Sequence, residues 1–155
     1  MVLILCGFGA YLSFKGVPLS ELFLTKEGSS SQVIIEGKSF TVRLARTTEE
    51  QQLGLGNVPS MPKDEGMLFI FPTVEYHSFW MKDTLIPLDI IWIGEDFTII
   101  HIEHNVQPES YPEIFTPNTP SLYVLELNGG ISKKYNFERG KKIELNLQND
   151  VDTID

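Results

Sequence analysis

After Cys6 the sequence contains no further cysteine, and basic side chains are scarce throughout. A single thiol cannot form a disulfide within the chain, and from residue 7 onward thiol catalysis and cysteine-ligated zinc are both excluded. Twelve lysines and arginines stand against 21 acidic residues, which gives a formal net charge of −9. Nucleic-acid binding requires a basic surface, so this acidic protein is predicted to have no nucleic-acid partner. An anionic membrane surface would repel it.

Residues 1–14 at the N-terminus form a long apolar stretch that carries no charge and is interrupted only by Ser13. Fourteen residues are too few for a comfortable membrane span, which needs about 20, but they match the apolar core of a signal peptide or anchor. No basic residue precedes this run, and a buried helix or strand is the alternative. Residues 15–32 include Gly16, Pro18 and three consecutive serines, a composition typical of a linker. We therefore expect an extracytoplasmic protein, membrane-anchored or secreted, that touches the membrane only through its N-terminal segment.

The remaining chain has the length and composition of one globular domain, predicted at residues 33–148 and followed by an acidic tail at 149–155. Short β-type segments separated by glycine and proline turns dominate it. The expected strands are 33–35, 40–45, 67–71, 79–82, 88–92, 97–102, 121–127 and 141–147. Residues 105–120 contain four prolines and are expected to form a long irregular loop. The pattern predicts a mainly β fold, a barrel-like or sandwich arrangement of seven to eight short strands with one or two short helices.

One of these helices has a clear start signal. Thr47 and Glu50 have the spacing of a capping box, in which each side chain bonds the backbone N–H of the other residue. Gly54 or Gly56 can end the helix. A second helical turn is expected at 133–137.

An unusual polar group follows Phe79. Trp80, Lys82, Asp83 and Thr84 precede Pro87, where the chain must turn because proline donates no ladder hydrogen bond. After that corner, alternation places Asp89 in a row of apolar side chains. A buried carboxylate requires a partner, and Lys82, Thr84 or a backbone amide at the Pro87 corner are the candidates.

Four motifs occur in order along the domain: GMLFIFP at 66–72, FWMKDT at 79–84, PLD at 87–89, and YVLEL at 123–127 before a Gly-Gly pair. With these motifs the sequence resembles the uncharacterised family named domain of unknown function 192, over roughly residues 40–147. The resemblance implies a small, mostly β, barrel-like domain found in bacteria and archaea, often behind a signal peptide or membrane anchor. It brings no settled activity.

The sequence departs from the family pattern in two places. The family usually has Asn where Asp83 stands, and it has a Met and a basic residue near positions 56–58, where this chain has Gly, Asn and Val. If the family residues bind a ligand, the ligand preference of this chain differs.

The candidate ligand-binding residues are Trp80, Lys82, Asp83, Thr84, Asp89 and Glu126. Our leading interpretation is a non-catalytic cleft in which they bind a small polar molecule or a peptide. Two alternatives stay open: a hydrolase-type enzyme with Asp89 or Glu126 as base and Lys82 stabilising negative charge, and a structural or interaction module in which the cluster only holds the fold. No catalytic residue is assigned and no cofactor is expected.

A metal site is not expected either. His101 and Glu103 are two residues apart on an expected strand and share a face, whereas His104 falls on the other face. Two ligands are too few for zinc, which takes three or four.

Overall fold

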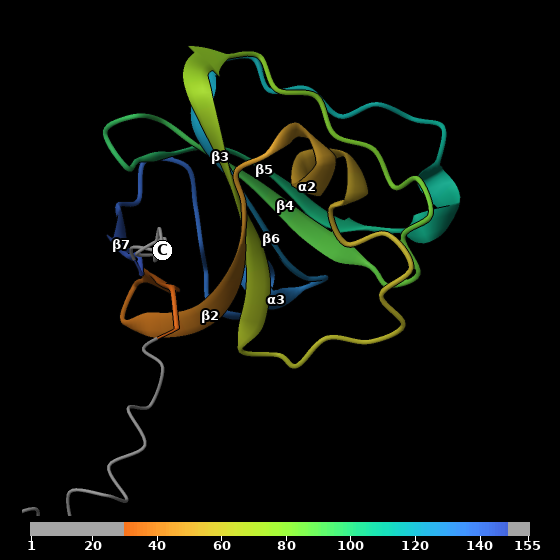
Figure 1. The fold of residues 1–155 in the computed structure, drawn as a ribbon. Coiled ribbons are helices and arrows are strands. Elements are labelled where there is room, and N and C mark those ends of the chain that lie inside the picture. The colour runs from red at the N-terminus through yellow and green to blue at the C-terminus, as the bar shows by residue number, and fades with distance from the viewer. Residues whose placement is uncertain (1–29, 149–155) are drawn as a thin grey trace, which may run out of the picture.

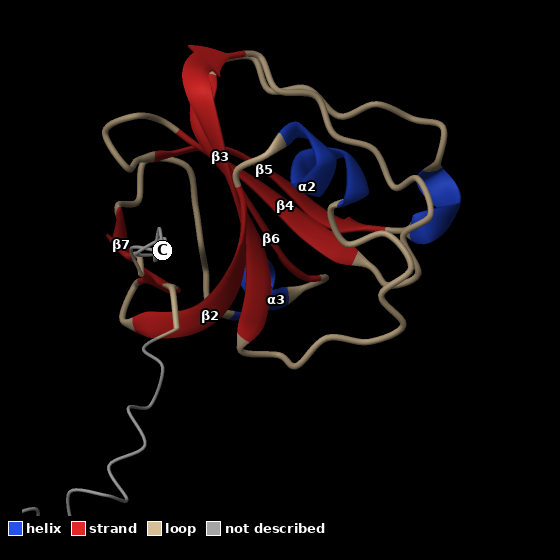
Figure 2. Cartoon of the chain, in the orientation of Figure 1, coloured by secondary structure: helices blue, strands red, loops and turns tan. Residues whose placement is uncertain are grey.

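The computed structural model describes residues 30–148, and within this range the fold is mainly β, as predicted. Figure 1 shows the arrangement of the elements, and Figure 2 shows how much of the chain is strand or loop. The elements are β1 (Gln32–Ile35), β2 (Lys38–Ala45), α2 (Thr48–Leu53), β3 (Glu65–Glu75), β4 (Leu88–Ile93), β5 (Ile99–Val106), η1 (Pro108–Ser110), β6 (Ser121–Asn128), α3 (Ile131–Lys134) and β7 (Ile143–Asn146).

The strands form one curved mixed sheet, a half-barrel, in the order β5-β4-β6-β3-β2-β1-β7. Among the strands of residues 30–148, only β2 and β3 pair in parallel. The two outer strands approach each other at one end, where Thr98 and Lys142 form an isolated bridge. Two backbone bonds of 2.9 Å, from Ile99 N–H to Lys141 O and from Ile143 N–H to Phe97 O, strengthen this closure. The curvature therefore partly protects the sheet edges, which would otherwise expose unpaired backbone groups.

Both faces of the central strands are buried, because two apolar clusters pack against opposite sides of the sheet. One cluster contains Ile91, Leu125 and Leu127 and fills the inside of the curve. The other contains Ile90, Trp92 and Val124, packed with residues from the segments around α2 and Met81. Alternate residues of β4 and β6 thus face different cores, as the two-residue period of a strand requires.

The first two strands and the first helix form where the sequence predicted them. Glu36 and Gly37 join β1 to β2 with φ values of 48° and 73°, the left-handed pair that a two-residue hairpin turn uses. The Thr47 hydroxyl accepts the Glu50 N–H, and the Glu50 carboxylate accepts the Thr47 N–H, so the capping box is complete. The helix ends at Gly54.

Four segments differ from the sequence-based prediction. Residues 79–82 do not form a strand, and only Phe79 makes an isolated bridge, to Phe115. The fifth strand starts at Ile99 rather than Phe97, because Phe97 has a φ of 62° and belongs to the turn after β4. The second helix lies at Ile131–Lys134, earlier than expected, and β7 is shorter than the predicted segment 141–147.

The predicted signal or anchor at 1–14, most of the linker and the acidic tail lie outside the described residues. Within residues 30–148, no helix has the length and apolar character needed to cross a membrane.

Candidate functional site

The site is built around Glu126 in the centre of β6. Its cross-strand neighbours are Ile90 on β4 and Met67 on β3, so its side chain projects toward the face that α2 covers. The residue is only 5% exposed, and its Oε2 atom has no hydrogen-bond partner among the described residues. Burial raises the pKa of Glu126 to about 8, because the charged form loses its hydration. At neutral pH the group is therefore mainly a carboxylic acid.

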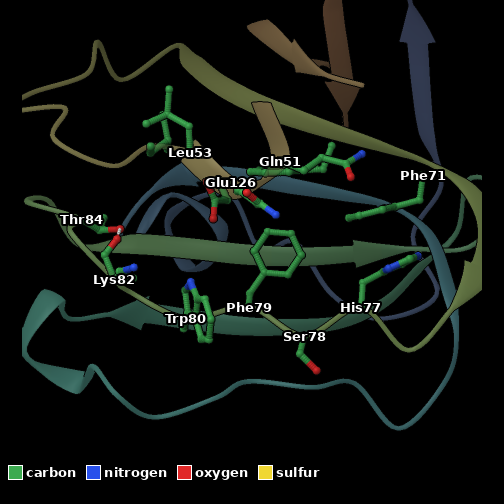
Figure 3. Close-up of a pocket in the computed structure, with 14 residues that line it drawn as sticks. Gln51, Leu53, Phe71, His77, Ser78, Phe79, Trp80, Lys82, Thr84 and Glu126 are labelled. Carbon is green, nitrogen blue, oxygen red and sulfur yellow. Dashed lines mark hydrogen bonds between the residues drawn. The ribbon is translucent and has the colours of Figure 1, made fainter. Parts of the chain in front are cut away.

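The Glu126 side chain opens into a pocket with a volume of about 150 Å³. Figure 3 shows the pocket between the end of α2 and the segment 77–84, with Glu126 pointing into it. Four of the predicted site residues line it together: Trp80, Lys82, Thr84 and Glu126. They come from two segments far apart in sequence, so the fold assembles a polar site within an apolar surrounding.

The segment that carries Trp80 is held in place through Phe79. The backbone N–H and C=O of Phe79 bond to Phe115 at 2.9 and 2.8 Å. Its ring makes edge contacts with the rings of Phe69 and Trp92, at centroid distances of 4.9 and 5.9 Å. With Phe79 and Met81 turned inward, the alternating chain places Trp80 at the surface, where it is 52% exposed. Trp80 thus forms an apolar wall at the mouth of the pocket.

A tight turn positions Lys82 and Thr84. Asp83 has a φ of 56°, and its carbonyl accepts the Asn57 N–H at 2.7 Å. Thr84 bridges to Gly56 in the loop after α2. The turn is therefore fixed against the helix, with the exposed Lys82 and the buried Thr84 on the pocket wall. The Thr84 hydroxyl donates only a long bond of 3.4 Å to Lys82 O.

The opposite wall is the last turn of α2. Gln51 donates from Nε2 to Ile70 O at 3.0 Å, which attaches the helix to β3. Leu53 lies at the rim and is 64% exposed, although it is a large apolar residue. An exposed leucine and an exposed tryptophan thus flank the same opening.

Asp89 does not belong to this pocket, which corrects its predicted grouping with Lys82. It pairs with Leu127 rather than Glu126, so its side chain projects to the other face of the sheet. Its carboxylate accepts the backbone N–H groups of Asn105, Gly130 and Ser132 at 2.7, 2.9 and 2.6 Å. The residue is fully buried, as predicted, but its partners are backbone amides of β5, of the turn after β6 and of α3. Such a closed arrangement serves structure, because it ties β4, β5 and α3 together.

Asp83 also lies outside the pocket lining, and its side chain is exposed. Its left-handed backbone explains the residue type, since Asn and Asp adopt this conformation more readily than other non-glycine residues. The Asp at this position is therefore compatible with the Asn that the family pattern shows.

The histidines are separate from one another. His101 bonds Glu103 at 2.8 Å, and His104 bonds the Ser132 hydroxyl at 2.7 Å. His77 lines the pocket, stacked on Phe71 at a centroid distance of 3.5 Å, and desolvation lowers its pKa. Among residues 30–148 there is no group of three side chains arranged to hold a metal ion.

Sequence reasoning missed part of the pocket. Its remaining side chains of note are Gln51, Leu53, Phe71, His77 and Phe79. Nothing in the sequence indicated that these side chains meet, because the helix and the aromatic residues face Glu126 only after β3 and β6 have paired.

The family model described as Uncharacterized ACR, DUF192, matches residues 31–145, which is well over half of the chain. The chain belongs to the DUF192 family. The family is uncharacterised, so membership fixes the fold and leaves the activity of this DUF192 protein to be inferred from its site.

Two solved structures resemble this DUF192 protein. A protein of unknown function from Novosphingobium aromaticivorans is 34% identical, with a TM-score of 0.69, over 74% of this chain and 82% of its own. A putative transcription regulator from Sinorhizobium meliloti is 35% identical, with a TM-score of 0.69, over 74% of this chain and 91% of its own. No curated protein matches the sequence.

Proposed function

We propose that this DUF192 domain binds a small polar ligand in the pocket lined by Trp80, Lys82, Thr84 and Glu126. The observation that carries the proposal is the Glu126 carboxyl group, buried without a hydrogen-bond partner among the described residues and turned into the pocket. A buried polar group of this kind costs free energy of folding unless something bonds to it. Unsatisfied groups in native proteins are often retained because a ligand uses them.

The walls support the same proposal. Ligand sites combine apolar and aromatic surface with a few convergent polar groups. Here Trp80 and Leu53 supply the apolar surface, and Lys82 and Glu126 supply the polar groups. The volume of about 150 Å³ is smaller than a drug-sized site of roughly 300 Å³ or more. We therefore infer that the pocket receives a small molecule, or one end of a larger one.

The test is a thermal-shift and NMR screen of small polar metabolites and short peptides against the wild-type protein. We expect at least one ligand that raises the melting temperature and whose effect is lost in Lys82→Met. Lys133→Met is the matched control, because it removes an exposed lysine that does not line the pocket. The proposal would be contradicted if every ligand found kept its effect in Lys82→Met, or if the screen found no ligand.

A general acid–base enzyme is the second candidate. It is favoured by the pKa of Glu126, which burial raises to about 8 in a pocket that Lys82 also lines, since acid–base groups work best near the ambient pH. Incubation with a panel of esters and amides tests it. Turnover that drops by about 100-fold or more in Glu126→Gln would establish the role. The enzyme hypothesis would be excluded if the wild-type protein turned over no compound of the panel.

The description of the Sinorhizobium protein as a putative transcription regulator suggests nucleic acid as another ligand. The net charge of −9 argues against this for the present chain, because phosphates must be neutralised by lysines and arginines. We propose that the domain has no nucleic-acid partner, and a mobility-shift assay with duplex DNA at low salt checks this.

We propose an extracytoplasmic location, with residues 1–14 as signal peptide or anchor. The support is the uncharged apolar sequence of that segment. Fractionation of cells that express the full chain and a chain without residues 1–14 tests the proposal. The full chain is expected in the membrane or outside the cytoplasm, and a full chain found with the shortened one in the cytoplasm would contradict it.

A further inference from the structure

We propose that the pocket recognises a carboxylate group, held between the Lys82 ammonium, the Trp80 indole N–H and the Glu126 carboxyl. This inference rests on the proposed function and names its ligand class. The carboxylate belongs to a small organic acid or to the C-terminus of a peptide, two sources that offer the same group.

The first support is that hydrogen-bond donors converge on the pocket. Figure 3 shows the nitrogens of Lys82 and Trp80 turned toward the pocket that Thr84 and Glu126 also line. Neither nitrogen has a hydrogen-bond partner among residues 30–148, whereas the indole of Trp92 donates to His77 O at 2.8 Å. Free donors at one opening match a ligand that only accepts hydrogen bonds, and an ionised carboxylate has that property.

The second support is the state of Glu126. Its carboxyl group is desolvated and lies beyond ion-pair distance of any described cation, so the neutral acid is favoured. As a neutral acid it donates a proton to an acceptor, and an O–H donated to a carboxylate forms one of the stronger hydrogen bonds in proteins. A cationic ligand would instead require Glu126 to ionise, and it would approach the like charge of Lys82.

The shape of the site suits one end of a molecule. A volume of about 150 Å³ holds a carboxylate with a few carbon atoms. The rest of a longer ligand would leave between Leu53 and Trp80, which are 64% and 52% exposed. Their apolar surfaces would cover an aliphatic chain or the residue before a peptide C-terminus.

Carboxylate binding should then depend on pH. The titratable groups on the pocket wall are Glu126, Lys82 and His77, and the described neighbours of Glu126 on β3 and β4, Met67 and Ile90, carry no charge. Desolvation lowers the pKa of His77 below its usual value, so His77 is already neutral at pH 7. Between pH 7 and pH 9 the ionisation of Glu126 would remove a donor and introduce a repelling charge.

The experiment uses three ligands of one length, butyrate, butyramide and butylammonium, titrated by NMR into the full chain in detergent. We expect butyrate to bind at least about tenfold more tightly than either of the others. Lys82→Met should lower butyrate affinity by about tenfold or more, while Lys133→Met retains it. In the wild type, affinity should fall from pH 7 to pH 9, approaching tenfold per pH unit above the pKa of Glu126.

Glu126→Gln keeps a neutral donor at the same place, so it should flatten the pH profile of butyrate binding between pH 7 and pH 9. Acetyl-dialanine and its C-terminal amide distinguish the sources. A peptide acid that binds more tightly than butyrate assigns the site to C-termini, and the reverse order assigns it to free acids. Both orders support the proposal, provided that the amide binds more weakly.

Other outcomes overturn it. Tighter binding of butylammonium, with affinity that rises with pH and is lost in Glu126→Gln, would assign the pocket to cations. Equal binding of butyrate and butyramide would remove the charge argument and leave a polar ligand site. Tighter binding of inorganic phosphate than of butyrate would assign the pocket to phosphate groups instead of carboxylates. If no ligand of any class binds, both this inference and the proposed function fail.

Discussion

Asp89 and Glu126 lie on neighbouring strands one residue out of register, so their carboxyl groups project from opposite faces of the sheet. Asp89 is enclosed by three backbone amides, whereas Glu126 opens into a pocket and has no partner among the described residues. Two buried acids in one sheet thus have different roles. The first stabilises the fold, and the second is available to a ligand.

The first prediction concerns Asp89. Replacement by alanine leaves three buried N–H groups without an acceptor, and we expect the free energy of unfolding to fall by about 3 kcal/mol. Asp89→Asn should cost less, about 1–3 kcal/mol, because one amide N–H would then face another N–H. Urea unfolding measures both. Asp64→Ala, at an exposed carboxylate, is the control, and an Asp89→Ala variant as stable as this control would refute the structural role.

The second prediction concerns the pH dependence of stability. The pKa of Glu126 is raised from an ordinary 4.5 to about 8 in the folded protein. The folded state therefore holds a proton that the unfolded state releases above about pH 4.5, and the stability that Glu126 contributes is lost as pH rises toward 8. Glu126→Gln cannot ionise, so its stability relative to wild type should rise through this window, by about 5 kcal/mol at most.

Denaturant unfolding of the wild type and Glu126→Gln at pH 4, 6, 7 and 8.5 checks this difference. Because all other titrating groups are shared, their contributions cancel in the comparison. A constant difference across these pH values would show that Glu126 is hydrated or paired in the folded protein.

The two tryptophans should separate binding from stability. Trp92 is fully buried and donates its indole N–H to His77 O, so Trp92→Ala should cost about 3–5 kcal/mol. Trp80 is half exposed, so Trp80→Ala should change the free energy of unfolding by about 0.5 kcal/mol or less. The same variant should bind any pocket ligand more weakly. Thermal melts and ligand titration of both variants test this. A large loss of stability in Trp80→Ala would place that side chain in the core.

The helix that walls the pocket depends on its N-cap. Thr47→Ala removes the acceptor for the Glu50 N–H and should lower stability by about 1 kcal/mol. It should also weaken ligand binding, because the same helix carries Gln51 and Leu53. Thr48→Ala is the matched control, since alanine is a better helix former at that exposed position. Equal effects of the two variants on stability and ligand affinity would show that the N-cap does not stabilise the helix beside the pocket.

Sequence periodicity and motif spacing predicted much of the fold. The alternation after Pro87 predicted that Asp89 is buried, and the spacing of Thr47 and Glu50 predicted the capped helix, because both depend on neighbours within a few residues. The partners of Asp89 were beyond such reasoning, since the amides of Gly130 and Ser132 reach it only through the pairing of β4 with β6.

The pocket shows the same limit. Trp80, Lys82 and Thr84 stood out as polar and aromatic residues close in sequence, but their meeting with Glu126 depends on the register of β3 with β6 and of β4 with β6. A shift of one residue in β6 would have exchanged the faces of Glu126 and Leu127. No local signal in the sequence fixes that register.

The most direct test follows the carboxyl carbons of Asp89 and Glu126 by NMR in isotope-labelled protein while butyrate is added at pH 7. We expect a saturable shift of the Glu126 carboxyl resonance and an unchanged Asp89 resonance, with the Glu126 shift lost in Lys82→Met. A Glu126 resonance that does not respond to butyrate, or a response at Asp89 alone, would contradict this expectation.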